Sequence, residues 1–412
     1  ASMQFEDGHP VHIMWPEERT PAQDITRSDN HLWIVYLAYA IIAESGDMSI
    51  LDREIPFLAP DKVHHSGSAS LWEHLLRGID FTEKHMGEHG LPLILFSDWN
   101  DHLGPFGRRG KGESIMVSQQ LIYALRQMIE LAELRGEQEL VEKFKARIQQ
   151  QEEALAKYAW DGDWYLRAYD YFGRKVGSKE NEEGQIFIES QGWCTMAGIG
   201  LEEGMVRKAL DSVKERLDCE HGIVLNNPAF TKYVVEYGEI SSYPAGYKEN
   251  AGIFCHNNPW VIIGETVLGR GDYAWDYFRK ICPSYTEQNS ALHKVEPYVY
   301  SQMIAGKDAA KPGEAKNSWL TGTAAWNWYA ITQFILGIKP EYNGLQIDPC
   351  ICSQWKEYTV TRRFRGSLYE ITVKNPEGAC KGIKEITLDG QPLDGNIVPY
   401  LPGEHKVTVI LG

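Results

Sequence analysis

Apolar residues recur at helical spacing along most of the chain up to about residue 345. In the first such segment Leu32, Val35, Tyr36 and Tyr39 share one side, and a Ser-Gly-Asp turn at 45–47 ends the period. Comparable patterns predict helices over residues 29–44, 70–86, 114–136, 138–158, 191–200, 204–217, 257–268, 273–281 and 319–336. Long loops with glycine and proline separate them, which is typical of helical hairpins arranged around a centre, with functional residues on the loops.

After about residue 345 the pattern changes to an alternation of apolar and polar residues, which is typical of strands. Strands are predicted over residues 358–363, 367–374, 383–388 and 405–411. Asp389-Gly390 and Pro402-Gly403 supply turns between them. The sequence thus predicts a mainly α domain of residues 1–345 and a small β-rich, sandwich-like domain of residues 346–412. The first thirty residues, interrupted by prolines, are predicted to be loop.

The charge balance narrows the classes of partner. The 412 residues include 41 Lys and Arg against 57 Asp and Glu, a net charge of −16, so nucleic acid is not an expected partner. The sequence contains no run of about 18 apolar residues, so a membrane span is not expected. The N-terminal residues lack the layout of a signal peptide. The seven cysteines form no CxxC pair, as expected of reduced thiols in a cytoplasmic protein. Thirteen Trp and 21 Tyr favour a carbohydrate ligand, although cores use Trp as well.

The most informative stretch of the sequence carries two carboxylates around a tryptophan, Asp98-Trp99-Asn100-Asp101, on a loop bounded by glycines. Cleavage of a glycosidic bond needs an acid that protonates the leaving oxygen. A tryptophan beside such an acid offers the sugar a platform and creates a less polar environment, which raises the pKa of a carboxyl group. The alternative is that the Asp pair only caps a helix or forms a turn.

Two further loops lead into apolar helices. His256 lies near the predicted start of the helix over 257–268, where a protonated imidazole and a helix N-terminus would suit an anion. Thr321-Gly322 lies where the helix over 319–336 opens, and a hydroxyl with free backbone N–H groups is what a phosphate needs. A satisfied polar histidine and a simple N-cap are the alternatives. Neither GxGxxG nor GxxxxGK[ST] occurs, so the usual nucleotide-binding loop is missing.

These motifs, in this order, cover essentially the whole chain. They comprise residues 95–101 with Gly112-Glu113-Ser114, Lys248-Glu249-Asn250 with His256, and the runs 296–302, 316–323, 344–351 and 363–366. Together they resemble the cellobiose/chitobiose phosphorylase family, glycoside hydrolase family 94. The resemblance implies an (α/α)6 barrel and a glycosyltransferase-type enzyme acting as a disaccharide phosphorylase. Such an enzyme splits a β-linked disaccharide, cellobiose- or chitobiose-like, with inorganic phosphate and inverts the anomeric centre, which gives an α-sugar 1-phosphate and a free sugar.

The resemblance also implies roles for individual residues. Asp101 matches the family's general acid, and Trp99 matches its aromatic partner at the sugar. Asp98 is expected to hold the loop. The leaving sugar is expected at Glu239 and Tyr243, and Gln191 is expected to contribute to the same substrate site. The phosphate is expected at His256, Gln302, Thr321 and Gly322. Acid, phosphate and sugar complete the chemistry, so neither a metal nor an organic cofactor is expected, and inorganic phosphate is a co-substrate.

One departure concerns length, since members of the family are longer at the N-terminal side. The barrel is therefore expected to lack its first helices, and the Arg/Asp-rich segment and the Arg that the family uses for sugar and phosphate would precede residue 1. A truncated polypeptide, a chain split from a partner that carries the other half, and a degenerate protein are the explanations left open. A homodimer is expected from the family, and open helix faces predict association.

Two other functions remain as alternatives. A hydrolase on the same barrel would need a second carboxylate about 6.5–9.5 Å from Asp101 with a water between them, and Glu239 is the candidate. A catalytically incomplete fragment would bind carbohydrate without turnover. The sequence leaves the acceptor sugar and its linkage open.

Overall fold

The computed structural model describes residues 1–18, 20–23, 25–107 and 109–412, and the chain divides into two compact units. The first unit comprises residues 1–39, 47–212 and 226–245, and the second comprises residues 40–46, 213–225 and 246–412. Both units mix helices with short strands. Each unit is described by itself below.

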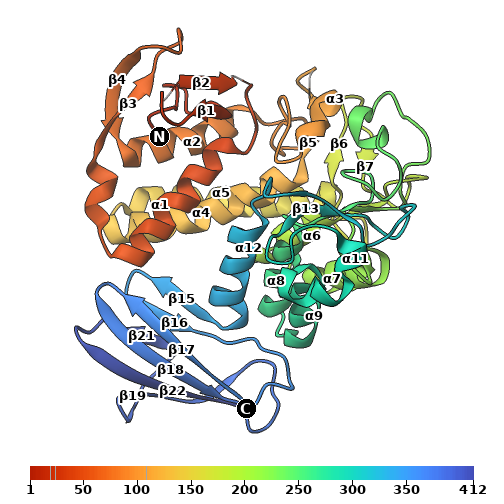
Figure 1. The fold of residues 1–412 in the computed structure, drawn as a ribbon. Coiled ribbons are helices and arrows are strands. Elements are labelled where there is room, and N and C mark those ends of the chain that lie inside the picture. Colours follow the sequence, from red (N-terminus) through yellow and green to blue (C-terminus); the bar gives the residue numbers. More distant parts are fainter. Residues whose placement is uncertain (19, 24, 108) are drawn as a thin grey trace. The chain divides into compact units, whose positions relative to one another are not determined.

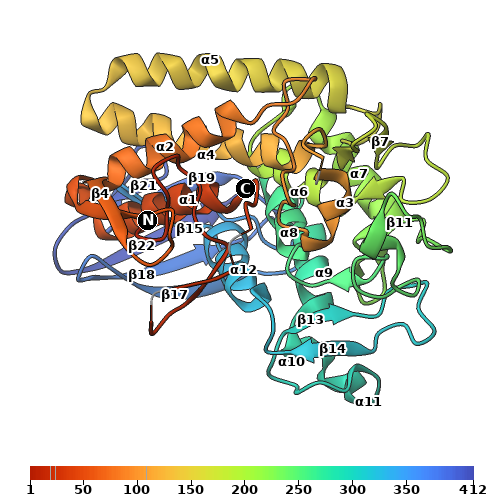
Figure 2. The ribbon, with the colours of Figure 1, turned by 90° about the horizontal axis from the view of Figure 1, so that it is seen from above.

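Helices make up the framework of the first unit. They are α1 (Asn30–Ser45, whose last turn belongs to the second unit), α2 (Leu71–Lys84), α3 (Gly104–Gly107), α4 (Ile115–Arg135), α5 (Gln138–Ala154), α6 (Ile188–Met196) and α7 (Met205–Arg216). Helices α4 and α5 run side by side (Figure 2). The hydroxyl oxygen of Ser114 caps α4 by accepting from Val117 N (3.2 Å), and Gly136 ends it at φ +73°. A π-helical turn over Leu155–Ala159 continues α5, so the long helices lie where the apolar period predicts them.

Short strands pair around these helices. They are β1 (Ile13–Trp15), β2 (Thr20–Gln23), β3 (Glu54–Leu58), β4 (His65–Ser70), β5 (Glu113–Ser114), β6 (Ala168–Tyr169), β7 (Lys175–Val176), β8 (Ile186–Phe187) and β11 (Asn226–Asn227). The prediction of a loop over the first thirty residues is wrong in part, because β1 and β2 form a hairpin. Pro21 lies opposite Met14 in a two-stranded sheet, where a missing N–H is tolerated.

An aromatic cluster forms part of the core of the first unit. Trp193 of α6 is fully buried, with its ring 5.9 Å from that of Trp33, 6.0 Å from that of Tyr36 and 5.9 Å from that of Tyr123. The edge-to-face contacts of Trp193 with Trp33 and Tyr123 are those that aromatic rings favour. Part of the high tryptophan content therefore serves the core rather than a ligand.

Five helices and five short strands of the second unit precede its C-terminal strands. These are α8 (Asn258–Val267), α9 (Gly271–Ile281), α10 (Pro283–Thr286), α11 (Ser290–His293), α12 (Thr323–Tyr329), β9 (Asp218–Cys219), β10 (Gly222–Ile223), β12 (Ile253–Phe254), β13 (Ser301–Ile304) and β14 (Ala315–Ser318). A π-helical segment, Ala330–Ile335, continues α12. The helix predicted from residue 319 starts only at Thr323, because Asn317 (φ +55°) and Trp319 (φ +70°) lie outside the right-handed helical region.

The C-terminal strands form two sheets within the second unit (Figure 1). The smaller sheet is antiparallel, and the larger one is mixed, because β18 and β22 pair in parallel. Their strands are β15 (Ile338–Glu341), β16 (Gly344–Ile347), β17 (Glu357–Phe364), β18 (Ser367–Lys374), β19 (Ile383–Leu388), β20 (Gln391–Pro392), β21 (Ile397–Pro399) and β22 (Glu404–Leu411). The orders are β15-β16-β21 and β17-β18-β22-β19-β20. The Asp389-Gly390 turn has positive φ at both residues, as a two-residue hairpin requires.

The β-rich C-terminal region is thus confirmed, whereas the remainder is mixed helix and sheet rather than mainly α. The described residues do not establish an (α/α)6 barrel. The predicted boundary between residues 345 and 346 falls inside strand β16, and the division at that point stays a prediction.

Leu37 and Ile41 of α1 and Trp328 of α12 are exposed apolar side chains. Among the described residues, no helix is long and apolar enough to cross a membrane.

Candidate active site

The loop that carries Asp101 is held at its start by two backbone hydrogen bonds. Phe96 N donates to Thr26 O (3.2 Å), and Ser28 N donates to Ser97 O (3.0 Å). A 3-10 turn, Asp101–Leu103, then begins after Asn100, whose side-chain oxygen accepts from His102 N (3.1 Å). Asp101 is therefore the first residue of a capped turn, with 59% of its side chain exposed.

A buried ion cluster lies beneath this loop. Both guanidinium nitrogens Nη1 and Nη2 of Arg167 donate to the carboxylate of Asp98 at 2.7 Å, and Arg167 Nε lies 3.3 Å from Oε1 of Glu189. All three side chains are fully buried. Asp98 also accepts from Ser114 Oγ (2.7 Å) and from Asn100 N (2.9 Å). Asp98 thus joins the Asp101 loop to the cap of α4, the structural position expected for it.

Two opposing effects set the charges in this cluster. Burial lowers the pKa of Arg167, but Asp98 and Glu189 outweigh it, so that the pKa of the guanidinium lies above its usual range. Burial raises the pKa of Glu189, and the nearby Arg167 charge opposes that rise. The Arg167 charge is therefore retained, and it compensates carboxylates that could not otherwise be buried.

Arg27 is the closest charged neighbour of Asp101 among the described residues. Its Nη1 lies 2.8 Å from Oδ1 of Asp101 and also donates to Ser97 Oγ, and its guanidinium lies over the Phe96 ring at 5.0 Å. Nε2 of His12 lies 4.0 Å from the same Oδ1 atom. Burial and the Arg27 charge lower the pKa of His12. The sequence analysis missed Arg27 and His12, because both precede the acid by more than seventy residues and no local motif marks them.

A third side chain, Asp29, is a buried carboxyl group beside Arg27. It accepts from Trp33 Nε1 (2.9 Å), and burial raises its pKa to about 7. Near neutral pH this group is therefore only partly ionised. The Arg27 charge opposes the rise in the pKa of Asp29, while the ion pair of Arg27 is with Asp101.

The structure brings together Glu239 and Tyr243, which sequence analysis assigned to the leaving sugar, through His102. Nδ1 of His102 contacts Oε2 of Glu239, and Nε2 of His102 lies 3.5 Å from the Tyr243 hydroxyl. Glu239 belongs to a 3-10 turn, Gly238–Ser241, that packs on the Asp101 turn. His102, the residue after the acid, is thus a site residue that sequence reasoning missed, although its position in the motif is a signal that could have found it.

Trp99 and Gln191 occupy different surroundings. Trp99 lies partly buried on the same loop as Asp101. Gln191 is fully buried in α6, where its amide accepts from Tyr165 N (2.9 Å) and donates to Tyr165 O (2.8 Å) and Phe187 O (2.9 Å). Because backbone groups occupy the Gln191 amide, its geometry is that of a structural residue rather than of the sugar contact expected from the sequence.

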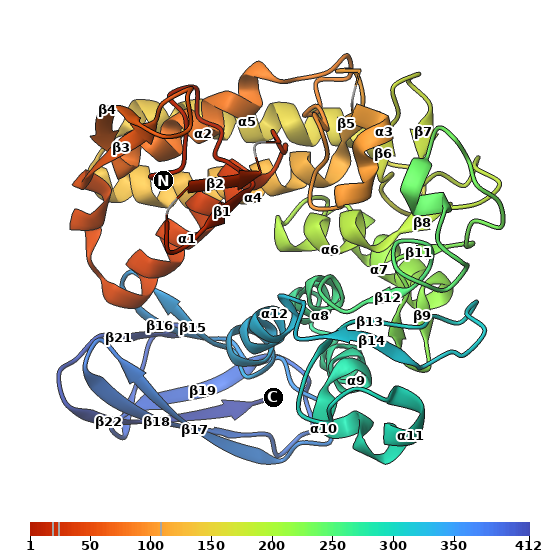
Figure 3. The same cartoon turned by 45° about the horizontal axis from the view of Figure 1, so that its top comes forward.

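In the second unit, the β12-β13-β14 sheet positions the residues assigned to phosphate (Figure 3). Cys255 N donates to Gln302 O (2.9 Å), so His256 follows directly where β12 meets β13. The Gln302 side-chain oxygen accepts from the Lys248 ammonium group and from Asn317 Nδ2 (2.9 Å). This bonding fixes the amide orientation and places the positive charge of Lys248 beside Gln302.

Thr321 and Gly322 lie beside His256. A Cβ atom added to Gly322 would come within 2.8 Å of Cε1 of the His256 ring, so the backbone approaches the imidazole as closely as glycine allows. The Thr321 hydroxyl oxygen accepts from Thr323 N (3.1 Å), the first residue of α12, and Gly322 occupies the N-cap position. His256, Gln302, Thr321 and Gly322 therefore form one cluster in the second unit, whereas the Asp101 cluster lies in the first.

His256 is a neutral imidazole in this structure at neutral pH. Burial lowers its pKa to about 4. The rings of Trp260 and Trp326 lie 5.8 Å and 6.3 Å from it. This differs from the expected protonated His256, because an apolar, aromatic environment disfavours the charged form. Its contribution to an anion site would be a hydrogen bond rather than a charge.

Among the described residues, no three His, Cys, Asp or Glu side chains are grouped so as to hold a metal ion. The seven cysteines are all free thiols.

Comparison with known proteins decides the family. Residues 5–337 match the family described as Glycosyl hydrolase 94 superfamily, catalytic domain. The chain belongs to this family. It is 37% identical to the N,N'-diacetylchitobiose phosphorylase of Vibrio proteolyticus, over 94% of this chain and 47% of that protein. It is 35% identical to the solabiose phosphorylase of Paenibacillus borealis, over 90% of this chain and 48% of that protein. The chain thus spans about half the length of these curated relatives.

A solved structure shares the fold of this family member at low sequence identity. The GH78 family rhamnosidase of Bacillus sp. GL1 has a TM-score of 0.57 and 15% identity, over 87% of this chain and 34% of that chain. At that identity the likeness shows the fold alone.

We expect Arg167→Met to destabilise this glycoside hydrolase family 94 chain by about 3–5 kcal/mol, because Asp98 and Glu189 would be left buried without a countercharge. Arg126→Met, which removes a surface contact with Glu152 (3.1 Å), should cost about 1 kcal/mol or less. Urea unfolding followed by circular dichroism measures both variants. Equal stabilities for the two would contradict the assigned role of the cluster.

We expect His256 to take up a proton only near pH 4 in the folded chain. An unfolded histidine does so near 6.5, so this residue makes the folded state less stable as the pH falls from 6.5 towards 4. NMR titration of the imidazole signal measures the midpoint directly, and His256→Asn assigns the signal by removing it. A midpoint at or above 6 would show that the imidazole is solvated rather than buried.

Proposed function

We propose that this chain carries the catalytic groups for inverting phosphorolysis of a β-linked disaccharide. The observation that carries the proposal is the Asp101 turn, where the carboxyl group is exposed next to His102, Glu239 and Tyr243. Family membership supports the same reading. The expected class is a glycosyltransferase acting as a disaccharide phosphorylase in the cytoplasm, with its helices in an (α/α)6 barrel.

In this mechanism Asp101 is the acid and phosphate is the nucleophile. Asp101 gives its proton to the oxygen between the two sugars while a phosphate oxygen attacks C1 from the opposite face. The C1–O bond breaks, the free sugar leaves with the proton, and the α-sugar 1-phosphate forms with inversion. Phosphate is already a competent nucleophile, so the reaction needs no second carboxylate to activate water.

Arg27 adds a requirement to this scheme. Its guanidinium contacts Oδ1 of Asp101, one of the two carboxyl oxygens, and this contact favours the ionised form. An ionised Asp101 is attracted to Arg27, whereas a general acid has to be protonated. We therefore propose that a sugar hydroxyl takes over a hydrogen bond from Arg27 and releases Asp101 as the substrate enters.

The groups proposed for phosphate supply one charge and several hydrogen-bond donors. Lys248 provides the charge, and the Gln302 oxygen is occupied by Lys248 and Asn317, which leaves the Gln302 N–H groups to donate. The neutral imidazole of His256 and the backbone beside Gly322 complete the set. No metal or organic cofactor is required by this scheme.

The disaccharide is proposed by class only. The curated relatives are named for diacetylchitobiose, for solabiose and for a glucopyranosyl-glucuronide, so related chains of this family differ in acceptor. We propose a cellobiose-like or chitobiose-like substrate, with the leaving sugar held at Glu239 and Tyr243. The proposal includes the homodimer that the family resemblance implies. It also includes a partner chain that carries the other half, since the chain spans about half of the length of those relatives.

The deciding experiment is a synthesis assay on the 412-residue chain. The protein is mixed with α-glucose 1-phosphate or α-N-acetylglucosamine 1-phosphate and a panel of acceptor sugars, and released phosphate is measured. We expect release with one donor–acceptor pair, and Asp101→Asn should slow it by about 10²–10⁴-fold, as for loss of a positioned proton donor. Asp211→Asn, on the exposed side of α7, is the matched control and should keep the rate.

The alternatives give different results in the same assay. A hydrolase would release the free sugar from a disaccharide without added phosphate. A binding fragment would show sugar binding by calorimetry with no turnover, and Asp101→Asn would not alter that binding. Near-normal synthesis by Asp101→Asn would overturn the assignment of the acid.

We expect Gln302→Leu to raise the KM for phosphate about tenfold with little change in kcat, because it removes hydrogen bonds to an anion and none to the leaving sugar. Initial rates of phosphorolysis at varied phosphate concentration measure both constants. Gln354→Leu, an exposed position of the same unit, serves as the control. A fall in kcat at unchanged KM would place Gln302 outside the phosphate site.

A further inference from the structure

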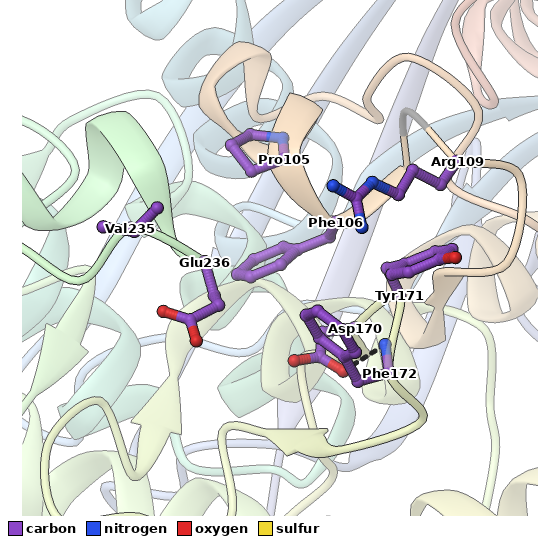
Figure 4. Close-up of a pocket in the computed structure, with 8 residues that line it drawn as sticks. All are labelled: Pro105, Phe106, Arg109, Asp170, Tyr171, Phe172, Val235 and Glu236. Carbon is purple, nitrogen blue, oxygen red and sulfur yellow. Dashed lines mark hydrogen bonds between the residues drawn. The ribbon is translucent and has the colours of Figure 1, made fainter.

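A separate pocket of about 510 Å³ lies in the first unit. It is lined in part by residues that follow the Asp101 turn and by residues that precede Glu239. Figure 4 shows the side chains that line it, which come from α3 and the loop after it, the β6–β7 turn and the segment before Gly238. Its volume falls in the range of about 300–1,000 Å³ that is typical of small-molecule sites. The lining residues are Pro105, Phe106, Arg109, Asp170, Tyr171, Phe172, Val235 and Glu236.

The walls of this pocket are largely aromatic. Phe106 is fully buried and is held edge-to-face against Tyr237 at 5.3 Å, so it forms a fixed wall. Tyr171 and Phe172 have rings 5.1 Å apart, and Phe172 is 60% exposed. Exposed ring faces next to a rigid apolar wall suit a ligand with C–H faces and a polar rim, as a sugar ring has.

The charges of the pocket are unequally compensated. The carboxylate of Asp170 accepts from Phe172 N (2.9 Å), Arg174 N (2.9 Å) and Arg174 Nε (2.7 Å), so its oxygens are occupied. Glu236 lies 3.8 Å from Arg174 Nη1. The two acids of the pocket thus share the Arg174 cation, which leaves them little attraction for a ligand.

The opposite side of the pocket holds the guanidinium of Arg109, for which the described residues supply no anionic partner, and Lys111 lies behind the same ring outside the lining. The guanidinium of Arg109 lies 4.7 Å from the centre of the Tyr171 ring, and the Lys111 ammonium group lies 5.8 Å from it. Among the described residues both cations contact the Tyr171 ring and no carboxylate, in a chain whose net charge is −16. A guanidinium with free N–H donors beside a concave surface attracts carboxylate or phosphate.

We propose that this pocket binds a sugar that carries an anionic group, with the ring against Tyr171 and Phe172 and the anion at Arg109. The site is distinct from the Asp101 turn, and its occupation does not depend on phosphorolysis. Val235 and Glu236 line the pocket and precede Glu239, so a sugar bound there would lie near the proposed contacts of the leaving sugar.

The proposal is tested by calorimetric titration of the chain with D-glucuronate, D-glucose 6-phosphate and D-glucose, without inorganic phosphate. At least one of the two anionic sugars should bind about tenfold more tightly than glucose, and Arg109→Gln should abolish that difference. Arg207→Gln, which removes an exposed arginine of α7 outside the pocket, is the matched control and should keep it. Glucuronate and glucose 6-phosphate distinguish a carboxylate from a phosphate as the anion.

Two further variants separate this pocket from the proposed active site. Phe172→Ala should weaken all bound sugars alike, and Glu239→Gln should leave the preference for the anionic sugar unchanged. Equal binding of glucose and both anionic sugars, or a preference that survives Arg109→Gln, would overturn the proposal. Loss of the preference in Glu239→Gln would also overturn it, by assigning the binding to the active site. Because no turnover is measured, a silent synthesis assay has no bearing on these results.

Discussion

The candidate active site depends on one buried cation. Arg167 lies between Asp98 and Glu189 with no exposure to solvent, and the charge of each carboxylate is tolerated in the interior only because the guanidinium is there. Asp98 in turn bonds Asn100 N and Ser114 Oγ, so the same interaction reaches the loop with the acid and the cap of α4. The loop that bears the exposed Asp101 is therefore anchored to a buried ion cluster.

This anchoring explains how an exposed carboxyl group can still be positioned. Asp101 is more than half exposed, so its place is set by the turn it begins and by Arg27. His102 follows on the same turn and connects it to Glu239 and Tyr243. A single short turn thus brings the proposed acid and the proposed leaving-sugar contacts to one place, although they are distant in sequence.

The sequence predicted the long helices and the C-terminal strands because their signals are local: the apolar period of α4 with its caps at Ser114 and Gly136, and the alternation in β18. It could not predict where α12 begins, since that depends on the left-handed backbone of Asn317 and Trp319. In the candidate site, the motif around Asp98 and Asp101 pointed to the loop, and Glu239 was assigned only through the family resemblance. Arg27 was not, because its role arises only when a segment about seventy residues away pairs with the loop. Gln191 was misplaced because burial, which sequence position does not reveal, directs its amide to the backbone.

The charge of His256 in the proposed phosphate site also depends on its environment rather than on the local sequence motif. A histidine near a helix start suggests a positive charge, yet burial against two tryptophans removes that charge and leaves Lys248 as the cation beside Gln302. A neutral donor has an advantage in this role. In the proposed site it would give phosphate a hydrogen bond while Lys248 supplies the charge, whereas a buried imidazolium would be costly to hold. The environment of His256, rather than its identity, therefore determines which chemistry it can support.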